Sequence, residues 1–311
     1  MNINLLRAGI ALPAALFLPL LLAAQGPGPG RRGILAHNPA NDDKPYDKHD
    51  LSGIWSRNGS PGGYGGGGTC RDCGDRGFGT AVPPLTPLGQ KMFDANKPSY
   101  GRLLGSADAA AHPEEPIGRR RAVPPANDSD PYQHCNPMGP SRALIYPDPL
   151  EMIALPDRII QQFEWGYGMR TLWNDGRKPL MDPDEPRWWG YSAGHWDGDT
   201  FVVTTTGVDE RTWVDQFGYP HSVDMILEER YRRTAYDVVE LSMTITDPKV
   251  YTQPWTSETK KFRKLSQDAI KTVDGWTGLM EDLCAPADEV ELFDKRVRDP
   301  AGGVIHSKND Q

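Results

Sequence analysis

The chain has 311 residues and a formal net charge of −8 at pH 7. This charge provides no basic surface for phosphates, so it disfavours nucleic acids and anionic membranes as partners. Glycine and proline, with 33 and 29 residues, indicate many turns and long loops rather than helices. The length suits one large domain or one domain with long loops.

The first 25 residues have the pattern of a secretory signal peptide. Arg7 precedes an apolar run over residues 8–22, and two alanines follow it. The run contains two prolines and is short for a membrane span, so we expect cleavage, export to the periplasm or the medium, and no membrane span in the mature protein. Residues 26–49 are polar and rich in Gly, Pro and Asn, which is typical of a linker.

Residues 50–149 are expected to hold one strand, one short helix and long loops. The strand is predicted over residues 51–55, and a glycine-dense segment follows it. The helix is predicted to begin at Pro87, with Thr86 as its N-cap, and to end near Asn96.

Residues 150–300 are expected to form an antiparallel β domain. Apolar and polar residues alternate over 238–246, which predicts a strand with one buried and one wet face. Eight segments bounded by turn residues have strand character: 152–155, 158–165, 169–173, 191–196, 200–206, 225–233, 238–246 and 258–265. Together with the first strand they predict an antiparallel meander closed into a calycin-like β-barrel, with a two-sheet sandwich as the alternative. A final helix is predicted over 288–298.

Residues 190–194 spell Gly-x-Ser-x-Gly, the pattern of a nucleophile elbow around Ser192. An elbow requires a strand, a sharp turn and a helix, whereas Asp197-Gly198 predicts a hairpin turn here. A serine ester hydrolase, with Ser192 as nucleophile, His221 as base and Asp209 or Asp224 orienting it, is therefore the less favoured enzymatic reading.

Four cysteines in an exported chain favour disulfides over free thiols. We expect Cys135 to pair with Cys284. Cys70 and Cys73 form a C-x-x-C pair without the histidine of a haem attachment site, and they are a local bridge, a redox pair or unpaired. No motif requires a metal ion or another cofactor.

Two acids on predicted strands, Glu164 and Glu229, are candidate site residues. A three-residue loop at 166–168 would place Glu164 opposite Arg170, either as a surface pair or as a pair lining a pocket. Glu229 shares a strand face with apolar residues, so it would need a buried partner, which Arg142, Arg170 or His221 could supply. Glu229 is then either part of a structural salt bridge or a general acid or base.

Most of the tryptophans and tyrosines are expected to fill a β core, but Trp188, Trp189, Trp213 and Trp255 lie beside turns, where the mouth of an apolar pocket would form. The sequence therefore favours an exported barrel that binds a small, partly apolar ligand. The candidate ligand contacts are Glu164, Arg170, His195, Glu229, Arg142 and Trp188. The alternatives are an acid/base enzyme that uses Glu229 with His221 or His195, and a structural envelope protein without a pocket. The oligomeric state stays open.

Several phrases of this chain resemble a family of exported bacterial proteins. They are Cys-Asn-Pro-Met-Gly-Pro-Ser-Arg at 135–142, Asp-Gly-Arg at 175–177, Ser-Ala-Gly-His-Trp-Asp-Gly-Asp-Thr at 192–200, Glu-Arg-Tyr at 229–231 and the segment 247–255 from Asp-Pro-Lys to Pro-Trp. The resemblance covers roughly residues 130–300 and implies export but no particular activity. The family usually has His-Glu-Gly-Asn after the late cysteine, whereas Ala285-Pro286-Ala287 follows Cys284 here. Leu51–Trp55 also resembles the Gly-x-Trp start of calycin barrels.

Overall fold

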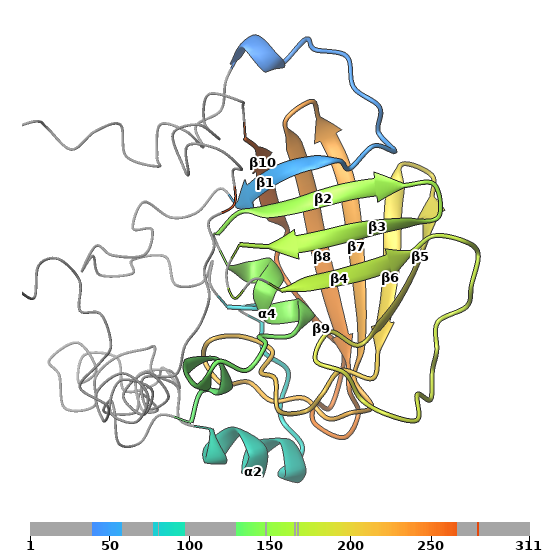
Figure 1. The fold of residues 1–311 in the computed structure, drawn as a ribbon. Coiled ribbons are helices and arrows are strands. Elements are labelled where there is room, and N and C mark those ends of the chain that lie inside the picture. Colours follow the sequence, from blue (N-terminus) through green and yellow to red (C-terminus); the bar gives the residue numbers. More distant parts are fainter. Residues whose placement is uncertain are drawn as a thin grey trace, which may run out of the picture.

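The computed structural model describes residues 39–57, 77–79, 81–96, 129–146, 148–164, 166, 168–265 and 279. These residues form a β-barrel with four short helices, of which the one over residues 39–41 lies toward one end and the one over residues 87–95 toward the other (Figure 1). The strands are β1 (Gly53–Arg57), β2 (Leu150–Leu155), β3 (Arg158–Phe163), β4 (Met169–Trp173), β5 (Tyr191–Asp197), β6 (Thr200–Thr206), β7 (Ile226–Ala235), β8 (Val238–Thr246), β9 (Trp255–Thr256) and β10 (Lys260–Lys264). The helices are η1 (Pro39–Asn41), α2 (Pro87–Ala95), η4 (Pro131–His134) and α4 (Pro140–Ile145).

Several predicted features lie outside the described residues. They are the signal peptide, most of the glycine-dense segment, Cys70, Cys73, Cys284 and the helix over 288–298. The described end of the predicted linker contacts the barrel, since the Asn41 side chain donates to Asp237 at 2.9 Å.

The barrel closes because β10 pairs with both β1 and β8. The strand order β10-β1-β2-β3-β4-β5-β6-β7-β8 returns to its start through this second pairing, and β9 pairs with the C-terminal part of β8. Closure leaves nine strands without a free edge, which removes the unpaired backbone groups of an open sheet. The predicted β-barrel is thereby confirmed, whereas the likeness to calycins stays a prediction.

One pair of neighbouring strands breaks the predicted antiparallel meander. β4 and β5 run parallel and share only two residue pairs, Leu172 with Ser192 and Trp173 with Ala193. Parallel neighbours cannot be joined by a tight turn, so residues 174–190 form a crossover from the end of β4 to the start of β5. The antiparallel prediction is therefore wrong at this pair.

The predicted register between β3 and β4 is also wrong. Gln161, not Glu164, lies opposite Arg170. The backbone N–H of Glu164 donates instead to the Pro149 carbonyl, and β3 ends at Phe163, before the residues that were expected to pair beside a three-residue loop. In the observed register Ile159, Gln161 and Arg170 all have buried side chains.

The hairpin between β5 and β6 turns at Gly198, as predicted, with Asp197 opposite Thr200. Gly194 lies opposite Val203, while Phe201 pairs with Trp196. The glycine still makes room for the ring diagonally, since a Cβ at Gly194 would lie 2.5 Å from Phe201 Cζ.

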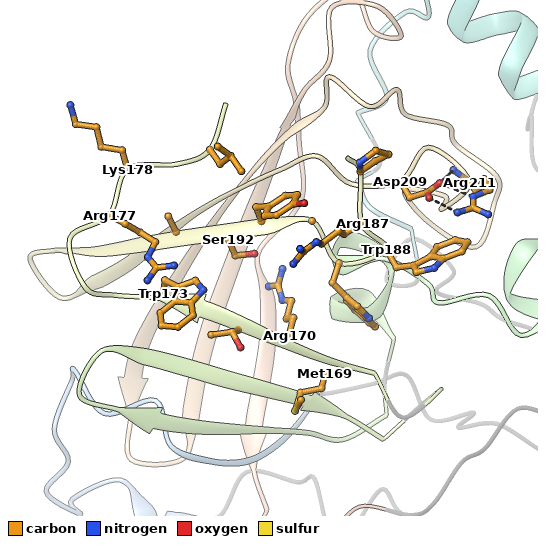
Figure 2. A pocket seen from close by; sticks show the side chains of 17 residues that line it. Met169, Arg170, Trp173, Arg177, Lys178, Arg187, Trp188, Ser192, Asp209 and Arg211 are labelled. Carbon is orange, nitrogen blue, oxygen red and sulfur yellow. Dashed lines mark hydrogen bonds and ion pairs between the residues drawn. The ribbon is translucent and has the colours of Figure 1, made fainter. Parts of the chain in front are cut away.

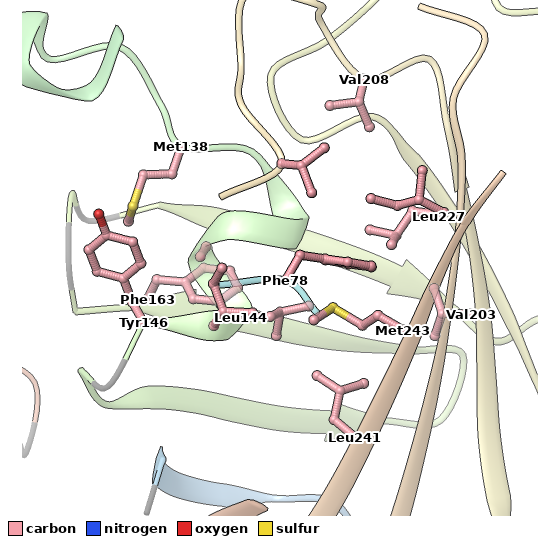
Figure 3. Close-up of a cluster of buried hydrophobic side chains, with 14 of the residues drawn as sticks. Phe78, Met138, Leu144, Tyr146, Phe163, Val203, Val208, Leu227, Leu241 and Met243 are labelled. Atoms are coloured by element: carbon pink, nitrogen blue, oxygen red, sulfur yellow. The ribbon is translucent and has the colours of Figure 1, made fainter. Parts of the chain in front are cut away.

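Side chains fill one end of the barrel. All six residues of α4 are buried, and Figure 3 shows this helix among the apolar side chains of the strands. Leu144 of α4 belongs to the same cluster as Phe78, Leu241 and Met243. The inward face of β8 alternates as predicted, with Val239, Leu241, Met243 and Ile245 fully buried.

The helix α2 begins as its sequence predicts. The Thr86 side chain accepts a hydrogen bond from Gly89 N at 3.0 Å, and Pro87 opens the helix. In the described part of the chain, no helix is long and apolar enough to cross a membrane.

Candidate functional site

A pocket of about 720 Å³ lies where β4 and β5 meet, under the crossover 174–190 (Figure 2). This volume is within the range of small-molecule sites, about 300–1,000 Å³. Its walls come from β4, the crossover, the start of β5 and the segment after β6, and comprise Met169, Arg170, Thr171, Trp173, Arg177, Lys178, Leu180, Pro186, Arg187, Trp188, Trp189, Gly190, Tyr191, Ser192, Ala193, Asp209 and Arg211.

The short parallel pairing of β4 with β5, called the seam below, explains why the pocket forms there. Successive side chains of a strand point to opposite faces, and the pocket takes residues from both faces of β4 and β5. Trp173 and Ala193 belong to the outer face, while the Arg170 and Ser192 side chains bond to residues inside the barrel. Because β4 and β5 are paired at only two positions, they are not joined along the rest of their length. The pocket extends into the barrel wall at this place.

The polar floor of the pocket is the end of a buried network. Arg170 Nη1 donates to Glu229 Oε1 at 2.9 Å, Nη2 donates to Glu229 Oε2, and Nε donates to Gln161 Oε1 at 2.7 Å. Burial lowers the pKa of Arg170, but the charge of Glu229 and the further interactions with Glu229 and Tyr231 together outweigh it and hold that pKa above the usual value. The guanidinium is therefore charged and fixed in position at the pocket floor.

Glu229 is held entirely by donors. Besides both Arg170 nitrogens, the Tyr231 hydroxyl donates to Oε2 at 2.6 Å and the Thr205 hydroxyl donates to Oε1 at 3.2 Å. Burial, followed by the charge of Glu229, raises the pKa of Tyr231 well above its usual value, so the phenol keeps its proton. Of the three predicted partners of Glu229, Arg170 is the one that the structure brings to it.

The hydroxyl of Ser192 has a defined direction. Thr205 donates its single hydroxyl hydrogen to the carboxylate, because a carboxylate only accepts. The bond of 2.9 Å between Ser192 Oγ and Thr205 Oγ1 must then be donated by Ser192. Ser192 consequently presents an oxygen that can accept a hydrogen bond at the pocket wall.

The remaining walls combine aromatic rings with guanidinium groups. Arg177 lies 3.7 Å from the ring centre of Trp173, Arg211 lies 4.2 Å from that of Trp188, and Arg187 lies 4.6 Å from that of Tyr191. Such pairs attract through the negative face of the ring.

Trp189 is placed by a glycine. A Cβ at Gly168 would lie 2.1 Å from Trp189 Cζ2, so the indole occupies the space that a side chain would need. The ring then stacks on Phe163 at a centroid distance of 5.1 Å. The loop before β4 and the end of the crossover are thereby packed together at the pocket.

The serine hydrolase arrangement is not assembled. His221 is buried, and its ring nitrogens bond to Thr212 Oγ1 at 2.7 Å and to the Ser222 carbonyl at 3.0 Å. Asp209 pairs with Arg211, and Asp224 pairs with Lys249. None of these groups bonds to Ser192, so the described residues contain no Ser-His-Asp chain.

The other predicted site residues lie apart from the pocket, except Trp188, which lines it. Arg142 is buried and makes a bidentate pair with Asp130, with both N–O distances at 2.7 Å. Glu164 is buried in the connection after β3, and His195 is exposed on β5. The predicted Glu164–Arg170 pair is wrong, because Arg170 pairs with Glu229 instead.

Sequence reasoning missed most of the pocket. Trp173, Arg177, Lys178, Arg187 and Arg211 were not among its candidates. The close spacing of cations and tryptophans at 173–178 and 187–189 is the one local signal for them. In the part of the chain that the structure describes, no cluster of His, Cys, Asp and Glu could hold a metal ion.

Comparison of the chain with family models, curated proteins and solved structures finds no match. The resemblance to a family of exported bacterial proteins therefore stays a prediction.

Proposed function

We propose that the protein is exported and binds a small, partly apolar ligand in the pocket between β4 and β5. The observation that carries this proposal is a pocket of small-molecule size whose walls are aromatic and whose polar floor is fixed by a buried network. Ligand sites are typically apolar with a few oriented polar groups. The signal-like leader supports export.

The pocket floor is preorganised. Arg170 cannot turn without losing its bonds to Glu229 and Gln161, so little side-chain entropy remains to be lost on binding. The acid/base alternative has less support, because Glu229 lies behind Arg170 with donors on both oxygens and does not line the pocket.

Titration with the neutral fluorophore N-phenyl-1-naphthylamine tests the site. We expect the mature protein to bind it with a rise in fluorescence, and Trp188→Ala to weaken binding by about tenfold through loss of an aromatic wall. Trp196→Ala is the matched control, because Trp196 is also half-buried but lies outside the pocket.

Native mass spectrometry of purified protein adds a second readout, since a tightly held ligand would appear as an added mass. No fluorophore binding by the folded protein, together with an empty native spectrum, would contradict the proposal. Equal loss of binding in Trp188→Ala and Trp196→Ala would contradict the location.

A further inference from the structure

The pocket carries an excess of positive charge, although the whole chain has a net charge of −8. Its lining contains one carboxylate, Asp209, and the cations Arg170, Arg177, Lys178, Arg187 and Arg211. Three of the cations have acidic partners: Glu229 for Arg170, Asp175 for Arg177 and Asp209 for Arg211.

Lys178 and Arg187 make no ion pair within the described residues. Besides Asp175, which pairs with Arg177, the crossover contains three acids, Asp182, Asp184 and Glu185, but none of the three lines the pocket or pairs with Arg187. Within the described residues the Arg187 side chain makes no hydrogen bond or ion pair, and its guanidinium lies over the ring of Tyr191. Two positive charges at the pocket are thus left without a neutralising acid.

Arg187 and Arg170 point toward the same space beside Ser192 (Figure 2). An arginine has five N–H groups, and the bonds of Arg170 to Gln161, Glu229 and Tyr231 use four of them. The fifth, on Nη1, has no partner among the described residues. Two guanidiniums that share a space repel each other unless an anion lies between them.

We infer that the ligand is an aromatic acid, a planar ring carrying a carboxylate. The inference rests on the proposed function. The carboxylate is bound between Arg187 and the free N–H of Arg170, because guanidinium groups match the planar geometry of a carboxylate. The ring lies against the aromatic walls formed by Trp188, Trp189 and Tyr191. Ser192 Oγ accepts a hydrogen bond from a hydroxyl on the ring, where the ligand has one.

Two fluorophores that differ only in one charged group separate the contribution of the ligand's charge to binding from that of its rings. The probe 8-anilinonaphthalene-1-sulfonate has the same ring skeleton as N-phenyl-1-naphthylamine and adds one anionic group, which stands in for the carboxylate. We expect the wild type to bind the sulfonate about tenfold more tightly than the neutral probe, as one charge-assisted contact provides.

Arg187→Met is the test variant, because Arg187 is exposed and its replacement leaves the buried network in place. We expect Arg187→Met to bind both fluorophores with similar affinity. Arg232→Met is the matched control: Arg232 is exposed on β7, lies outside the pocket, and should leave the preference for the sulfonate unchanged.

Competition identifies the headgroup. We expect 1-naphthoate to displace the bound sulfonate probe and 1-naphthalenemethanol, its uncharged counterpart, to displace it at least about tenfold less well. Equal affinity of the wild type for both fluorophores, or an undiminished preference in Arg187→Met, would overturn the inference while leaving the proposed function intact. Failure of both fluorophores to bind would count against the proposed function itself.

Discussion

Arg170 of β4 and Glu229 of β7 form a bidentate ion pair across the barrel interior, although their strands are not neighbours. Both side chains are almost completely buried. The pair fastens β4, which shares only two residue pairs with β5, to β7, from which β5 and β6 separate it in the strand order. It therefore supports the strand that forms one side of the pocket.

Glu229→Ala should destabilise the protein strongly, because it leaves the Arg170 charge buried without a partner. We expect a loss of about 3–5 kcal/mol in the free energy of unfolding, measured by urea denaturation. Asp175→Ala is the control, since it breaks the exposed pair with Arg177 and should change stability little. Similar losses of unfolding free energy in both variants would show that the buried pair stabilises the protein no more than the exposed pair does.

Asp215 should make the protein less stable at neutral than at acidic pH. Burial raises the pKa of this carboxyl from 3.8 to about 6, although the Phe78 and Phe217 backbone N–H groups donate to it. A raised pKa in the folded state favours folding below pH 3.8, and this contribution is lost as the pH rises through about 6. Relative to wild type, Asp215→Asn should therefore gain about 2–2.5 kcal/mol between pH 4 and pH 7.

The difference in unfolding free energy between Asp215→Asn and wild type, measured across this range, checks the expectation. Taking the difference cancels the groups that both proteins share. A difference that stays constant with pH would contradict the raised pKa.

His221 should act in the opposite direction. Burial lowers the pKa of the ring below its usual value of 6.5, so the folded protein favours neutral histidine. The neutral His221 ring contributes its full share to the free energy of unfolding above pH 6.5. This contribution is lost as the pH falls through the folded-state pKa, because the unfolded chain binds the proton at a higher pH than the folded protein does. His221→Gln should remove this loss.

Unfolding measured between pH 7.5 and pH 5 checks it. Thr212→Val is the control, because it removes the hydroxyl bonded to Nε2 but keeps the titrating ring. The prediction fails if His221→Gln and wild type lose stability in parallel on acidification.

Gly168→Ala should displace Trp189, since the new Cβ would lie 2.1 Å from the indole. Forcing extra volume into a packed site costs about 1–3 kcal/mol. The same substitution should cost little in a Trp189→Ala background, where the ring is absent. Equal costs in the two backgrounds would show that the glycine is required for another reason. Weaker binding of N-phenyl-1-naphthylamine by Gly168→Ala would show that Trp189 shapes the pocket.

The predicted bond between Cys135 and Cys284 can be tested by mass spectrometry of peptides from the unreduced, mature protein. We expect a linked pair of peptides that contains these two cysteines. A bridge closing about 150 residues is worth roughly 4–5 kcal/mol in the chain-entropy account, so Cys135→Ser should lower the melting temperature. A peptide linking Cys135 to Cys70 or Cys73 would replace the predicted pairing.

Local patterns determined most of the strands and the helix α2. The alternation over 238–246 gave β8 its correct bounds and its buried face, and Asp197-Gly198 correctly predicted the hairpin of β5 and β6. The helix α2 follows from Thr86 and Pro87. These elements could be predicted because their causes, turn chemistry and the period of apolar residues, lie within a few residues of each other.

The position of Glu229 could also be predicted, because an acid on an apolar strand face must find a buried partner. Its choice of Arg170 over Arg142 and His221 depended on the tertiary structure, since Asp130 holds Arg142 and Thr212 holds His221. Arg142, Arg170 and His221 lie far apart in the sequence, so no local pattern shows which of them reaches Glu229. The partner is determined by how the folded barrel places them.

The pocket itself was decided by the tertiary structure. It depends on the parallel pairing of β4 with β5, and a pairing of two residues leaves no local pattern in the sequence. Trp173, Arg187 and Arg211 converge only after the crossover and the segment following β6 are laid over that seam. In the sequence each of them looks like an ordinary loop or strand residue, because its role depends on residues that lie next to it only in the closed barrel.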